Sequence, residues 1–180
     1  MTLPGAGVAP PALPPGAGVL VVGYGNPLRS DDGVGPVVAE RLASDPRLLG
    51  AEIRAEHQLT PELALDASRA SLLVLIDAAD GVPAGEVVVR RLPAGGVVDA
   101  DTAGEAGPPL THHLDPAGLL GLARELWGTA PPVVIVGIGA ASLEVGDRLS
   151  PVVEAAVGRA VDVVAAEVAG AAATAGSGER

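Results

Sequence analysis

The chain has 180 residues, a formal net charge of −11 at pH 7 and no cysteine. This length predicts one domain, and the negative charge argues against binding nucleic acid or anionic membranes, which attract basic surfaces. Without cysteine, disulfides, zinc–thiolate sites and a thiol nucleophile are excluded.

The chain is expected to begin with a disordered leader, residues 1–17, because this segment is rich in Pro, Gly and Ala. A single α/β domain over 18–169 and a flexible tail over 170–180 should follow. No apolar run reaches the roughly 18 residues of a membrane helix, and the first residues lack the basic region of a secretory signal. We therefore expect a cytoplasmic protein.

Strands and helices are predicted to alternate through the domain. Apolar runs predict strands over 19–23, 51–57, 71–78, 86–92 and 133–138. Helical spacing of apolar residues, or a proline at the first turn, predicts helices over 33–43, 61–69, 115–127 and 150–168. This order predicts a three-layer α/β fold, with a mostly parallel twisted sheet of about five strands flanked by helices on both faces. The long Gly-, Ala- and Pro-rich loop 93–111 is interpreted as a lid.

The segment GYGNPLRSDDGVGP, residues 23–36, connects the first strand to the first helix. It imitates the GxGxxG phosphate loop, but Leu28 stands where the third glycine should be. Asp31 and Asp32 would also repel a phosphate at the N-terminus of the helix. We interpret the turn as one that lets the backbone approach closely, with its acids placed to meet a cation. Asp31 is interpreted as a first-turn or hydrogen-bonding residue.

Three candidate ligand residues are expected at the carboxyl edge of the sheet, where open α/β folds bind their ligands. Asp32 follows the first strand, Asp77 ends the apolar run LLVLID, and His112 precedes the third helix. Two carboxylates and an imidazole could hold a first-row metal such as nickel or zinc. Three protein ligands would leave coordination positions open for a substrate.

Each candidate also has a structural alternative. Asp32 could be a helix N-cap or a first-turn acid, and His112 could be merely solvated, like its neighbour His113. Asp77 favours function more strongly, because an acid directly after an apolar run is costly to bury without a partner. His57 is interpreted as a structural residue or as one that supports the site.

Four segments carry a resemblance to a known family: GYGNPLRSDDGVG, LIDAADGVPAGEV, THHLDPAGLLGLA and VIVGIGAASLEVGDRLSPVV. Together they resemble the hydrogenase maturation endopeptidases over about residues 19–168. The resemblance implies a protease that removes a C-terminal extension from the large-subunit precursor of nickel–iron hydrogenase, after nickel insertion. It implies that Asp32, Asp77 and His112 contact the metal, and that the substrate supplies the nickel. The family often has Glu where Asp32 stands.

The sequence leaves two other functions open. The candidate serines lack the context of a nucleophile elbow; they are Ser30, Ser71, Ser142 and Ser150. A peptidase of this kind would therefore need another source of reactivity, which a nickel ion carried by the hydrogenase precursor would provide. The alternatives are a non-proteolytic metal-binding module and a conventional metallohydrolase on the same fold, because a fold does not decide a function.

Overall fold

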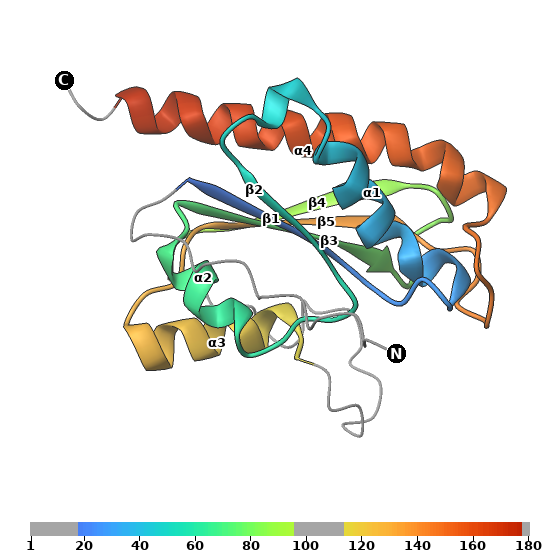
Figure 1. Ribbon diagram of the computed structural model, residues 1–180, viewed down its shortest axis with the longest axis horizontal. Coiled ribbons are helices and arrows are strands. Elements are labelled where there is room, and N and C mark those ends of the chain that lie inside the picture. Colours follow the sequence, from blue (N-terminus) through green and yellow to red (C-terminus); the bar gives the residue numbers. More distant parts are fainter. Residues whose placement is uncertain (1–17, 96–113, 178–180) are drawn as a thin grey trace, which may run out of the picture.

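The computed structural model describes residues 18–95 and 114–177 of the chain (Figure 1). Its strands are β1 (Val19–Tyr24), β2 (Glu52–Glu56), β3 (Leu72–Ala79), β4 (Val87–Leu92) and β5 (Val133–Gly139). Its α-helices are α1 (Val34–Leu42), α2 (Leu63–Arg69), α3 (Pro116–Trp127) and α4 (Pro151–Ser177). Two short 3₁₀ helices are η1 (Ser30–Gly33) and η2 (Pro46–Leu48). Strands and helices follow the predicted order.

The strands form one sheet in the order β2-β1-β3-β5-β4. β1, β2, β3 and β5 run parallel, and β4 pairs with β5 in the antiparallel direction. The predicted edge position of the fourth strand is therefore confirmed. Because the four parallel strands point the same way, the loops that follow them gather at one edge of the sheet, which is the edge predicted to carry the site.

Helices cover both faces of the sheet, as predicted (Figure 1). On one face, α1 and α4 pack their buried apolar residues on Val21, Val74 and Val136. On the other face, α2 and α3 pack on Leu20 and Leu73. Alternate residues of the central strands thus enter opposite cores, as expected for a sheet buried on both sides. The three-layer α/β fold is confirmed.

The boundaries differ from the prediction by more than one residue in two places. α2 begins at Leu63 rather than at residue 61, because Pro61 and Glu62 form a turn before it. α4 continues to Ser177, into the segment 170–180 for which we expected a flexible tail. The alanines of this segment, which have the highest helix propensity, account for the longer helix. The predicted leader 1–17 and most of the loop 93–111 lie outside the described residues.

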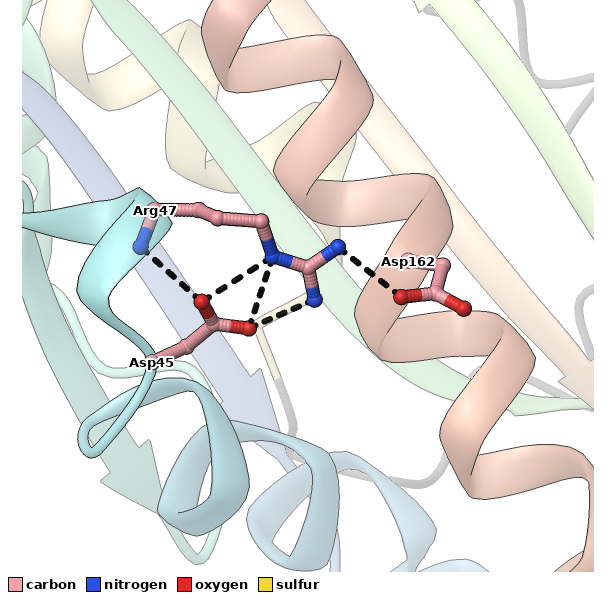
Figure 2. Close-up of polar contacts among 3 residues, drawn as sticks. All are labelled: Asp45, Arg47 and Asp162. Atoms are coloured by element: carbon pink, nitrogen blue, oxygen red, sulfur yellow. Dashed lines mark hydrogen bonds and ion pairs between the residues drawn. The ribbon is translucent and has the colours of Figure 1, made fainter.

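An arginine joins the turn after α1 to the long C-terminal helix (Figure 2). The guanidinium of Arg47 donates to both carboxylate oxygens of Asp45 and, at 2.9 Å, to Asp162 of α4. Asp45 also accepts a hydrogen bond from the backbone N–H of Arg47 at 2.9 Å and so caps η2. Because Arg47 is half exposed, solvent screens these ion pairs, and they stabilise the fold only weakly. Within the described residues, no helix is both long and apolar enough to cross a membrane.

Candidate functional site

The ends of β1 and β3 bring Tyr24 and Asp77 together. The two strands pair in parallel as far as Gly23 and Ile76, and Tyr24 and Asp77 are the next residues along each strand. The Tyr24 hydroxyl is hydrogen-bonded to the Asp77 carboxyl group. The Asp77 carboxyl group also accepts a hydrogen bond from the N–H of Ala78 at 2.8 Å. Asp77 is therefore oriented at the carboxyl edge of the sheet, as predicted.

Burial raises the pKa of Asp77 from its ordinary value of 3.8 to about 7. The hydrogen bonds from Tyr24 and Ala78 act in the opposite direction, and the negative charge of Asp32 adds to the increase. An ionised Asp77 is costly mainly because the carboxyl group is buried, and an arriving cation would relieve this cost. The structure thus places Asp32 close enough to Asp77 for their charges to interact.

Burial also raises the pKa of Tyr24 well above its ordinary value, and the charges of Asp77, Asp115 and Asp32 add to this increase. The Tyr24 hydroxyl consequently stays protonated and acts as a donor. Asp115 is the N-cap of α3, where its carboxylate accepts a hydrogen bond from Gly118 at 2.7 Å. The N-terminus of α3 therefore faces the same part of the sheet edge.

Asp32 does not cap the helix that follows it. Gly33 occupies the N-cap of α1 and makes no side-chain cap hydrogen bond. The Asp32 carboxylate instead accepts a hydrogen bond from the N–H of Asn26 at 3.0 Å, inside the turn. The N-cap role that the sequence allowed for Asp32 is therefore not observed, whereas its first-turn position is, because Asp32 lies in the first turn of η1. Asp32 remains half-buried on the turn between β1 and α1.

Close backbone contacts require a glycine at position 25 of the turn after β1. Gly25 has a φ of +141°, and a Cβ there would lie 1.8 Å from the carbonyl oxygen of Asp32. A side chain at position 25 would therefore displace the segment that carries Asp32. This agrees with the interpretation of the turn as one that lets the backbone approach closely.

Asp31 is a hydrogen-bonding residue, as interpreted from the sequence, but its partners were not predicted. Its carboxylate is fully buried and accepts hydrogen bonds from three backbone N–H groups, at Ala141, Ser142 and Ser150, and from the Ser150 hydroxyl, at 2.6–3.0 Å. Burial alone would raise its pKa, but these donors hold the pKa of Asp31 below its ordinary value. The hydrogen bonds of Asp31 thus connect the turn after β1 to the loop between β5 and α4.

Of the three histidines in the chain, only His57 lies within the described residues. His57 is exposed just after β2, and His112 and His113 lie outside the described residues. Among the residues that the structure describes, no group of three or more His, Asp and Glu side chains is arranged to hold a metal ion. The metal-ligand roles predicted for Asp32, Asp77 and His112 therefore stay predictions.

No protein-family model matches this chain, and no curated protein matches it. Solved structures do match, and the class they define is that of an α/β peptidase fold. The chain is similar to the hydrogenase maturating endopeptidase HybD from E. coli, with 26% identity, a TM-score of 0.67 and coverage of 81% of this chain and 88% of that one.

Two further structures agree with this class. One is the hydrogenase 2 maturation peptidase from Thaumarchaeota archaeon SCGC_AB-539-E09, with 29% identity, a TM-score of 0.61 and coverage of 84% and 97% of the two chains. The other is the [NiFe] hydrogenase maturation protease HycI from Thermococcus kodakarensis KOD1, with 26% identity, a TM-score of 0.59 and coverage of 83% and 90%. The resemblance to hydrogenase maturation endopeptidases is thereby confirmed.

Proposed function

We propose that this chain is an endopeptidase that removes the C-terminal extension from a nickel–iron hydrogenase large-subunit precursor after nickel has been inserted. The observation that carries the proposal is the Asp32 and Asp77 pair, held at the carboxyl edge of a fold whose structural neighbours are named hydrogenase maturation peptidases. In this proposal the reaction takes place in the cytoplasm.

The nickel ion is the signal by which the enzyme recognises a precursor ready for cleavage. Asp77 and Asp32 would contact the ion, and His112 would supply a neutral imidazole. Carboxylate and imidazole ligands without thiolates give the free enzyme only a modest affinity for nickel or zinc. The enzyme therefore receives the metal with its substrate, and binding would offset the cost of ionising the buried Asp77.

The direct test is to incubate the enzyme with the nickel-loaded precursor and to determine the mass of each product. We expect two products, the mature large subunit and the free C-terminal extension. A conventional metallohydrolase would instead purify with stoichiometric zinc and cleave whatever the nickel content of its substrate. A binding module would bind the precursor and leave it intact. Either result would contradict the proposal.

The neighbouring histidines offer a matched pair of variants. We expect His112→Ala to reduce cleavage of the nickel-loaded precursor by at least about tenfold, because the nickel would lose its imidazole ligand. His113→Ala should change the rate by less than about twofold, since we assign this residue no contact with the metal. The initial rate of product formation measures both effects. Equal losses in the two variants would show that His112 is not the specific ligand.

A further inference from the structure

Two exposed apolar side chains sit on neighbouring loops at the edge that carries Asp32. Leu28 is 64% exposed on the turn after β1, and Val145 is 93% exposed on the loop between β5 and α4. The backbone joins these positions directly, because Leu28 accepts a hydrogen bond from the N–H of Gly146 at 3.0 Å. Arg29 and Gly146 also form a parallel β-bridge. In Figure 1 the two loops meet at the right-hand side of the molecule.

Several backbone and side-chain hydrogen bonds hold these two loops together. Ser30 donates its N–H to Gly146 at 2.9 Å and its hydroxyl to the carbonyl of Glu144 at 3.1 Å. The buried Asp31 adds the four hydrogen bonds described above. Ser30 has a φ of +49°, the only positive value at a non-glycine residue among those described. Such a conformation persists only where the surrounding contacts impose it.

The contact between the loops is also sterically close. A Cβ at Gly146 would lie 2.4 Å from the hydroxyl oxygen of Ser30. A rigid loop pair that exposes two large apolar side chains loses little conformational entropy when a partner covers it. A partner that covers Leu28 and Val145 would therefore contact side chains whose backbone is already held in place.

The surroundings of the apolar pair are polar and of mixed charge. Arg29, Arg148, Glu144 and Asp147 are all exposed on the same two loops. Neither arginine takes part in an ion pair within the described residues. An apolar centre with a polar rim is the usual composition of a protein–protein interface.

We propose that Leu28 and Val145 form a docking surface for the folded body of the substrate precursor. The proposal rests on the proposed function, because it names the partner of the same site. Asp32 follows Leu28 in the same turn, so a folded protein that delivers its nickel to Asp32 must also lie against these two loops. The docking surface would hold the precursor while its C-terminal extension reaches the site.

The test compares KM and kcat for the nickel-loaded precursor between wild type and the double variant Leu28→Ser, Val145→Ser. Removing both apolar contacts should raise KM by about tenfold or more and lower kcat much less. Leu28→Met keeps an apolar side chain and should retain the wild-type KM. Leu49→Ser is the matched control, because Leu49 is 87% exposed but lies in the connection between η2 and β2.

The outcomes separate this inference from the proposed function. If wild type cleaves and the double variant keeps its KM, the docking surface is refuted and the proposed function stands. If wild type does not cleave the nickel-loaded precursor, the proposed function fails and the docking proposal fails with it. An equal rise in KM for Leu49→Ser would also overturn the docking proposal, because it would show a general effect of lost apolar surface. Unfolding temperatures should be the same in all four proteins, since the altered side chains are exposed.

Discussion

Asp77→Asn is expected to reduce cleavage of the nickel-loaded precursor by at least about 100-fold while making the free enzyme more stable. The amide keeps the size of the side chain and can still accept the hydrogen bond from Tyr24. It removes the negative charge, which the nickel requires as a ligand. Mutating a residue that supports a metal ligand typically lowers metal affinity or activity about 10–100-fold. Loss of a direct metal ligand should lower the cleavage rate at least as much.

The gain in stability should depend on pH. The pKa of Asp77 is raised to about 7 in the folded protein from an ordinary 3.8, so the folded state retains a proton that the unfolded state loses. The free energy of unfolding therefore falls as pH rises between these values, and the loss is complete above about pH 7. Asp77→Asn avoids this loss. We expect it to be about 1–3 kcal/mol more stable than wild type at pH 8, and nearly equal to wild type at pH 4.

Denaturant unfolding at pH 4, 6 and 8 measures this effect. Asp80→Asn is the matched control, because Asp80 follows the same strand but is exposed. Its stability and cleavage rate should both stay close to those of wild type. A cleavage rate for Asp77→Asn within a few-fold of wild type would remove Asp77 from the site. A stability difference that does not change with pH would show that folding leaves the pKa of Asp77 at its ordinary value.

The second large effect is expected for Gly35→Ala, which should destabilise the fold by at least about 3 kcal/mol. A Cβ at Gly35 would lie 2.3 Å from the carbonyl oxygen of Tyr24 and 2.5 Å from that of Ile76. Both contacts are with the backbone of central strands, which cannot move aside without breaking the sheet. The same strands carry Tyr24 and Asp77, so the change should also disturb the site.

Gly158→Ala in α4 is the control for this substitution. A Cβ there would meet no atom within 4 Å, so alanine should stabilise the protein by about 0.5–1 kcal/mol through its better helix propensity. Thermal and denaturant unfolding of both variants would measure the difference. Comparable stability of Gly35→Ala and wild type would mean that α1 does not pack on β1 and β3 as closely as described.

The fold could be predicted because its signals are local. The apolar run that ends in Asp77 predicted a buried central strand with an acid at its carboxyl end, and both features are confirmed. The Asp-Pro at the start of α3 predicted the observed cap. The end of α4 was predicted wrongly. The helix continues to Ser177 because the helix propensity of the alanines outweighs the effect of the glycines and of the terminal position.

The hydrogen-bond partners of Asp31 could not be predicted in the same way. Its hydrogen-bond partners lie 110 to 119 residues further along the chain, and no local pattern connects Asp31 to them. The adjacent acids Asp31 and Asp32 were the only signal, and they do not reveal which one is buried. The same holds for the neighbouring positions of Leu28 and Val145, which depend on the pairing of two distant loops.

The most direct test of the account compares cleavage of the same large-subunit precursor with and without its nickel. Enzyme purified without added metal should be largely free of nickel and zinc by elemental analysis. It should release the C-terminal extension from the nickel-loaded precursor, as seen by mass spectrometry, and leave the nickel-free precursor intact. Equal cleavage of the two precursors, or tightly bound zinc in the active enzyme, would contradict the central claim.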